Sequence, residues 1–177
     1  MSNHPLESVL LSLGSNIEPD RHLPAAARLL AVQVQMVAAS RVFQTVPAGD
    51  SPGPIFLNAA LEIRCDLEPG RLKHRVLRPL EEKLGRVRSD DRNAPRTIDV
   101  DISLYGQRVV REIEEHLEIP DPEILTRAHV AIPLADVAPT TVHPVVGLTL
   151  EEIARRFGGQ GVRVMEGLVL WPQSDKL

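Results

Sequence analysis

The chain has 177 residues, 43% of them hydrophobic, and a formal net charge of -4 at pH 7. This length suits a single domain, and the slightly acidic balance gives no reason to expect nucleic acid or an anionic membrane as a partner. Cys65 is the single cysteine, which excludes a disulfide framework and a cysteine-based zinc site. No apolar run approaches the roughly 20 residues of a membrane span, and no signal-peptide core opens the chain, so we expect a cytoplasmic protein.

The first half of the chain alternates short apolar runs with segments of helical periodicity. The pattern predicts a strand over 8–13, a helix over 20–34, a strand over 36–46, a strand over 56–63 and a helix over 67–84. Asp20 is placed to cap the first helix. Pro79 lies inside the second, which it should kink or split, and Gly85 should end it.

The strand over 56–63 carries an unusual amide. Asn58 stands in an apolar run, and it either bonds to backbone at a strand end or recognises a heterocycle with paired donors and acceptors. Phe56 lies two residues earlier, on the same face, where it could stack on such a ring. The Pro/Gly-rich stretch 45–54 before it is either a connector or a loop that shapes a ligand site.

The most informative stretch is 92–102, in which two arginines and a proline precede a β-branched run over Thr97–Leu104. In a strand, Asp99 and Asp101 would lie side by side, with Ile98, Val100 and Ile102 on the other face. Two carboxylates this close repel each other, and magnesium takes such carboxylates together with substrate phosphates. The alternative is an exposed strand face that carries aspartates for solubility.

Four arginines precede or enter this stretch: Arg86, Arg88, Arg92 and Arg96. Guanidinium groups bind phosphate oxygens in bidentate fashion, so the cluster favours a magnesium-nucleotide site over a solvated basic loop. Further along, Thr149 begins a capping-box pattern ahead of a helix over 148–157, and the apolar stretch 162–171 favours an added edge strand. The six histidines show no ligand-like spacing, so zinc is not expected.

The stretch 92–102 resembles the signature of the 6-hydroxymethyl-7,8-dihydropterin pyrophosphokinase family of the folate pathway. Further resemblances are Gly14-Ser15-Asn16, the run 56–60, the run 81–88 and the segment 117–139, all in the family's order. Together they cover about 8–157. The resemblance implies an α+β, ferredoxin-like fold with an antiparallel sheet flanked by helices. The chain is then a single domain, 1–177, with 158–177 as a C-terminal extension; its element order supports this fold independently.

The same resemblance implies transfer of pyrophosphate from ATP to the hydroxymethyl group of the reduced pterin, with release of AMP. Two magnesium ions would be held by Asp99 and Asp101, and either aspartate could take the hydroxyl proton. The implied catalytic residues are Arg86, Arg96, Asp99 and Asp101. The implied pterin-binding residues are Thr45, Val46, Ala48, Phe56, Asn58 and His129. The implied ATP-binding residues are Glu81, Arg86, Arg88, Arg96, Ile102 and Arg127. Partners would be small molecules only, and the chain a monomer or homodimer.

Three positions depart from the family pattern. Asp121 stands where a histidine near the phosphates is usual, His129 replaces a phenylalanine that walls the pterin, and Gly53 replaces a glutamine before Phe56. These departures keep open a second class, a non-catalytic pterin- or nucleotide-binding relative. A third class is an interaction domain without a ligand. Magnesium-dependent ATP binding would exclude the third class, and loops 14–19, 46–54 and 86–96 are candidates to close over substrates in the first.

Overall fold

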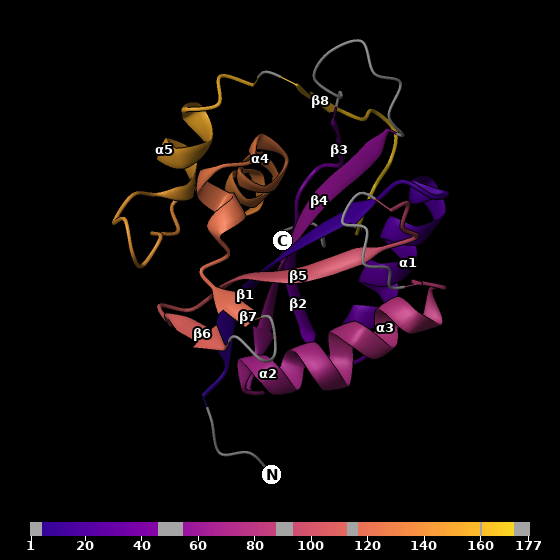
Figure 1. The fold of residues 1–177 in the computed structure, drawn as a ribbon, viewed down its shortest axis with the longest axis horizontal. Coiled ribbons are helices and arrows are strands. Elements are labelled where there is room, and N and C mark those ends of the chain that lie inside the picture. Colours follow the sequence, from indigo (N-terminus) through magenta and orange to yellow (C-terminus); the bar gives the residue numbers. More distant parts are fainter. Residues whose placement is uncertain (1–4, 46–54, 88–93, 113–116, 160, 172–177) are drawn as a thin grey trace, which may run out of the picture.

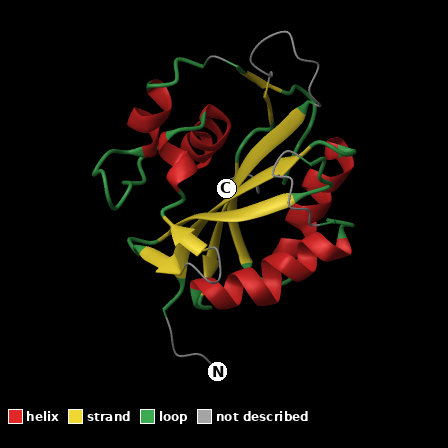
Figure 2. Ribbon diagram, viewed as in Figure 1, coloured by secondary structure: helices red, strands yellow, loops and turns green. Residues whose placement is uncertain are grey.

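The computed structural model describes residues 5–45, 55–87, 94–112, 117–159 and 161–171. Figures 1 and 2 show a twisted sheet that lies between two groups of helices. The described strands are β1 (Glu7–Ser15), β2 (Gln35–Ala39), β3 (Phe43–Thr45), β4 (Phe56–Cys65), β5 (Asp99–Tyr105), β6 (Val110–Glu112), β7 (Leu117–Ile119) and β8 (Val162–Val164). The described α-helices are α1 (Pro19–Ala31), α2 (Pro69–Leu72), α3 (Arg78–Lys83), α4 (Ala128–Val137) and α5 (Leu150–Arg155). A π-helical segment (Lys73–Leu77) joins α2 to α3, and a 3₁₀ helix (Pro122–Leu125) precedes α4.

The main sheet, as far as the described ranges define it, runs in the order β5-β1-β4-β3-β8, with β2 also paired to β4. Its pairings are antiparallel. β1 therefore lies between β4 and β5, and β5 forms one edge. The predicted α+β class with an antiparallel sheet and flanking helices is confirmed. The predicted edge strand in the C-terminal stretch is β8, which pairs with β3.

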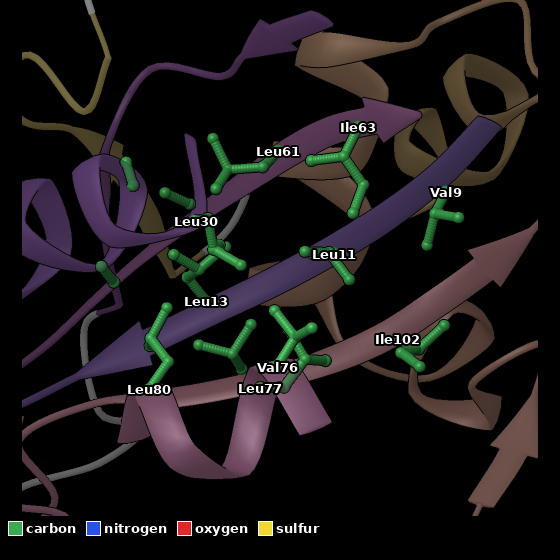
Figure 3. Close-up of a cluster of buried hydrophobic side chains, with 14 of the residues drawn as sticks. Val9, Leu11, Leu13, Leu30, Leu61, Ile63, Val76, Leu77, Leu80 and Ile102 are labelled. Carbon is green, nitrogen blue, oxygen red and sulfur yellow. The ribbon is translucent and has the colours of Figure 1, made fainter. Parts of the chain in front are cut away.

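Two apolar layers hold the helices against the sheet. On one face, Leu30 of α1 and Leu77 and Leu80 of the segment ending in α3 pack against Leu11 and Leu61 of the central strands (Figure 3). On the other face, α4 and α5 cover a smaller cluster formed by Leu10, Ala60, Leu104, Ile124, Val130, Ala131, Leu134, Ala138, Leu150 and Ile153. Odd and even residues of β1 therefore point into different layers, as the pleat requires.

Pro79 is accommodated by a π-helical segment. Pro79 has no N–H with which to bond to the carbonyl of Arg75, as a continuous α-helix would require. The turn just before it widens, and Arg78 N donates to Lys73 O, five residues earlier. The interruption expected at Pro79 is therefore this π-helical segment. The helix then continues as α3 and ends before Gly85, whose φ is 80°, as predicted.

Three local expectations were wrong and one was confirmed. The single strand predicted over 36–46 is divided into β2 and β3, with residues 40–42 between them outside any strand. Asp20 lies in the first turn of α1; the N-cap is Glu18, in the left-handed region with a φ of 42°. β5 begins at Asp99 and not at Thr97, because the carbonyls of Arg96 and Thr97 bond to the turn after β1 and not to a ladder. Thr149 caps α5 through the predicted capping box with Glu152.

Candidate active site

Asp99 and Asp101 lie on the same face of edge strand β5, as their spacing predicts. Val100 and Ile102 between and beside them are buried on the other face, at 4% and 5% exposure. In the ladder with β1, Asp99 stands opposite Gly14 and Asp101 opposite Ser12. Gly14 in turn stands opposite Asn58 of β4, so Asn58, Gly14 and Asp99 form one row across three strands.

This row forms the floor of a pocket that opens on the α4 side of the sheet. Its empty volume is about 510 Å³, part of it open to solvent. The lining residues are Ser12, Leu13, Gly14, Phe56, Asn58, Arg96, Asp99, Asp101, Asp121, Glu123, His129 and Val130. Six predicted site residues therefore meet here: Phe56, Asn58, Arg96, Asp99, Asp101 and His129.

Arginines already surround the Asp99 carboxylate. Nη1 of Arg96 lies 2.5 Å from Oδ2 of Asp99, and Nη2 of Arg86 lies 3.7 Å from the same oxygen. The Arg96 guanidinium also lies over the Phe56 ring, 5.8 Å from its centroid. Arg96 thus spans from the carboxylate to the aromatic ring, and the charge of Asp99 is partly balanced.

Around Asp101 most of the described charges are negative, and Lys73 opposes them. Although part of Asp101 reaches solvent in the pocket, desolvation by the surrounding protein, followed by the charges of Asp99, Asp121 and Glu81, raises the pKa of Asp101 to about 7. An oxygen ligand in a crowded negative site is suited to a hard cation. In the described ranges no three His, Cys, Asp or Glu side chains are grouped to hold a metal.

The turn after β1 holds the backbone of the arginine loop. Asn16 Oδ1 accepts a hydrogen bond from Arg96 N at 2.6 Å, and Asn16 N and Ile17 N donate to Arg96 O at 3.1 and 3.2 Å. Ser15 Oγ donates to Thr97 O at 2.5 Å. Ser15, the last residue of β1, and Asn16 just after it therefore fix the peptide from which the Arg96 side chain reaches Asp99; the turn expected at Gly14-Ser15-Asn16 begins only after Ser15.

Asn58 is oriented by a neighbouring strand. Its Nδ2 donates to Thr45 Oγ1 of β3 at 2.5 Å, which leaves its carbonyl oxygen toward Gly14. A Cβ on Gly14 would lie 3.3 Å from this oxygen, a tight contact, so glycine makes room for the amide. Thr45 therefore supports Asn58, and its own substrate contact stays a prediction.

Two of the three departures from the family pattern, Asp121 and His129, line the pocket. Asp121 caps the 3₁₀ helix by accepting from Glu123 N at 2.9 Å, and burial raises the pKa of Asp121 to about 6. Burial, with a smaller effect of Arg127, lowers the pKa of His129. This favours a neutral imidazole in the pocket. A neutral histidine keeps the ability to stack on a flat ligand.

Other described residues with a predicted ATP role are not among the lining residues. Glu81 is buried, and its Oε1 accepts from Val100 N at 2.9 Å. Ile102 belongs to the core, and Arg127 is exposed at the start of α4. Their ATP contacts stay predictions. Val46, Ala48, Gly53, Arg88 and Arg92 are outside the described residues.

Pocket residues that the sequence did not indicate are Ser12, Leu13, Glu123 and Val130, while Gly14 was expected only as part of a closing loop. Ser12 and Gly14 carried a usable signal, because they are the non-apolar alternate positions of an otherwise apolar strand. Glu123 and Val130 reach the pocket through the fold of 121–130 and had no local signal.

The fold and the pocket together fit an enzyme that brings a phosphorylated ligand next to a flat heterocycle. The family model described as 7,8-dihydro-6-hydroxymethylpterin-pyrophosphokinase (HPPK) matches residues 10–139, well over half of the chain. The chain belongs to this family. The resemblance seen in the sequence is thereby confirmed.

Relatives agree with this assignment. The 2-amino-4-hydroxy-6-hydroxymethyldihydropteridine pyrophosphokinase of Porphyromonas gingivalis is 39% identical over 77% of this chain and 93% of its own length. The enzyme of the same name from Methylorubrum extorquens is 36% identical over 88% of this chain and 97% of its own. The folic acid synthesis protein fol1 of Pneumocystis carinii is 34% identical over 81% of this chain, but this chain spans only 19% of it.

Solved structures agree on the fold. The chain matches wild-type Plasmodium falciparum HPPK-DHPS, solved with pteroate, with a TM-score of 0.67 at 13% identity. This match covers 89% of this chain and 43% of the Plasmodium chain. A doubly substituted form of that protein, solved with pterin and p-hydroxybenzoate, matches with a TM-score of 0.71 at 11% identity, over 93% and 48% of the two chains. This chain thus spans about half of those structures.

Proposed function

We propose that this chain transfers a pyrophosphoryl group from ATP to the hydroxymethyl oxygen of 6-hydroxymethyl-7,8-dihydropterin, giving the pterin diphosphate and AMP. The observation that carries the proposal is the meeting of Asp99, Asp101 and Arg96 with Phe56 and Asn58 in one pocket. The two aspartates are suited to bind a cation and Arg96 is suited to bind phosphate. Phe56 and Asn58 are suited to bind a flat, hydrogen-bonding ring. Membership of the family supports the same reaction.

The pterin is proposed to lie between Phe56 and His129. Asn58, fixed by Thr45, offers its carbonyl oxygen to the ring's amino or amide N–H groups. This contact would orient the ring, and with it the hydroxymethyl group, relative to the aspartates. Orientation of this kind is the main contribution a protein makes to phosphoryl transfer. Val46 and Ala48 are proposed to complete this part of the site.

ATP is proposed to lie with its phosphates toward Arg96, Arg86 and the two aspartates. Asp99 and Asp101 would hold two magnesium ions, which would supply positive charge to neutralise the phosphates. The guanidinium groups that now contact Asp99 are placed to donate to phosphate oxygens next to it. Arg88, Arg127, Glu81 and Ile102 are proposed as further ATP contacts.

Several broader features are proposed with the activity. The sheet is proposed to be ferredoxin-like, which the adjacency of β5, β1 and β4 supports. Residues 1–177 are proposed to form one domain, because β8 and Leu170 join the sheet and the core. No helix within the described ranges is long and apolar enough to cross a bilayer. We propose a cytoplasmic monomer or homodimer that acts on small molecules, without nucleic acid or membrane partners.

The test is to incubate the protein with ATP and the reduced pterin, with and without magnesium, and to measure the AMP released by chromatography. AMP that requires both pterin and magnesium, and that is lost in Asp99→Ala and Asp101→Ala, supports the proposal. Glu151→Ala, on the surface of α5, is the matched carboxylate control and should leave the rate unchanged. No AMP from a protein that still binds pterin or ATP by calorimetry would replace the proposal with the non-catalytic relative.

A further inference from the structure

We propose that Glu81 is a positioning residue for the aspartate pair: its buried carboxylate holds the backbone of Val100, the residue between Asp99 and Asp101, at the open edge of the sheet. The proposal rests on the proposed function only in so far as those aspartates serve as cation ligands. It assigns Glu81 a role through β5 in addition to the ATP contact predicted from the family.

β5 needs such a partner because it is an edge strand. Among the strands that the structure describes, its ladder partner is β1, on one side only. In an antiparallel pair, alternate residues point their N–H groups away from the neighbouring strand. Val100 is one of these, since its N–H meets Glu81 Oε1 at 2.9 Å and not the facing residue Leu13. Without a partner, this buried N–H would be left unsatisfied.

The glutamate is itself rigidly placed. Glu81 belongs to α3, is 3% exposed, and its carbonyl accepts from Leu84 N at 3.1 Å and Arg86 N at 2.9 Å. Arg86 is the residue whose guanidinium lies 3.7 Å from Asp99. One residue therefore fixes two backbones that meet at Asp99: its side chain holds the strand that carries the aspartate, and its carbonyl holds the arginine that contacts it.

The hydrogen bond to Val100 N–H does not by itself require a charge, because a neutral amide would also accept it. The negative charge of Glu81 is therefore proposed to have a second effect. Burial of a carboxylate is costly, and a charged acceptor makes a stronger hydrogen bond than a neutral one. Glu81 lies close enough to Asp101 for its negative charge to act on that carboxyl. A negative charge behind the pair attracts a cation in front of it. Loss of the charge should therefore weaken metal binding even when the hydrogen bond remains.

The experiment separates these two contributions with three variants. Glu81→Gln keeps an acceptor for Val100 but removes the charge, Glu81→Ala removes both, and Glu82→Ala is the control on the exposed side of the same helix. One readout is hydrogen exchange of the Val100 amide by nuclear magnetic resonance without ligands. The other is calorimetric affinity for a non-hydrolysable ATP analogue with magnesium, compared with that measured without it.

In Glu81→Ala we expect Val100 amide exchange to accelerate by about 10-fold or more, the factor that loss of one buried hydrogen bond implies. The magnesium-dependent part of analogue binding should fall with it. In Glu81→Gln the magnesium-dependent gain should fall several-fold while Val100 stays largely protected. Glu82→Ala should match the parent chain in both measurements.

Unchanged exchange at Val100 in Glu81→Ala, or an unchanged magnesium-dependent gain in both Glu81 variants, would overturn the proposal. If Glu81→Ala does not fold, the magnesium-dependent gain in Glu81→Gln decides alone, and an unchanged gain is the contrary result. Failure of the proposed function would look different, since a parent chain that makes no AMP still reports Val100 exchange and metal-dependent binding.

Discussion

Arg96 contacts the Asp99 carboxylate with Nη1 2.5 Å from Oδ2, and the same guanidinium lies over the ring of Phe56, 5.8 Å from its centroid. One side chain therefore joins the cation end of the pocket to its aromatic end. Its backbone is held by Asn16, through the 2.6 Å bond from Arg96 N to Asn16 Oδ1. The two proposed substrates would thus meet at an arginine whose position is set from both its main chain and its side chain.

Replacement of Arg96 should cost turnover more than substrate binding. Arg96→Ala removes a donor aimed at developing phosphate charge, and kcat should fall by about 100-fold or more. Arg96→Lys keeps the charge but loses the planar fork and the ring contact, so an intermediate loss is expected. Steady-state kinetics of AMP release measures both. Arg21→Lys, at an exposed ion pair with Glu18, is the control; a loss below threefold in Arg96→Ala would contradict the role.

His129 should make folding stability sensitive to mild acid. Burial lowers the pKa of His129, so the folded state favours the neutral ring. At a pH above the unfolded value of about 6.5 both states are neutral; as the pH falls below it, the unfolded state takes up the proton first and the free energy of unfolding decreases. Glu123 and Arg127 act on His129 as smaller, opposed charges.

The measurement is urea unfolding of the parent chain and His129→Phe at about pH 7.5 and about pH 5.5, on either side of the histidine range. Asp121, with its pKa raised to about 6, titrates nearby, so the difference between the two proteins is the relevant quantity. His129→Phe should lose less stability on acidification and should bind pterin with less dependence on pH. An equal loss of unfolding free energy in both proteins would show that protonation of His129 does not contribute to the acid sensitivity.

Gly14→Ala should weaken pterin binding through Asn58. The added methyl group would lie 3.3 Å from Asn58 Oδ1, which must move by a few tenths of an ångström and loosen its bond to Thr45. We expect a loss of about 5-fold to 10-fold in pterin affinity by fluorescence, about 1 kcal/mol. In an Asn58→Ala background the same change should cost little, because the contact is gone. Additive losses would contradict the coupling.

Local chemistry predicted much of the site from the sequence. Asp99 and Asp101 were placed on one face by the period of a strand, and Gly85 was read as a helix end by its need for a positive φ. Phe56 and Asn58 stand on the predicted strand and reach the pocket. These features depend on residues that are neighbours in the chain, so the spacing of those residues is enough to predict them.

Contacts between distant segments could not be predicted in this way. The hydrogen bond from Val100 N to Glu81 joins residues 19 positions apart in the chain, and the hydrogen bond from Arg96 N to Asn16 joins residues 80 positions apart. Asp20 was misplaced as a cap because Glu18 takes a left-handed conformation that its residue type does not indicate. The pairing of β1 with both β4 and β5 determines which polar residues meet.

The most direct test is mass spectrometry of the pterin product formed from ATP with magnesium. We expect a pterin that gains two phosphoryl groups in one turnover, with AMP formed in equal amount and no pterin monophosphate before it. A pterin monophosphate formed together with ADP would contradict transfer of a pyrophosphoryl group. An unmodified pterin, from a protein that binds both substrates, would contradict catalysis itself.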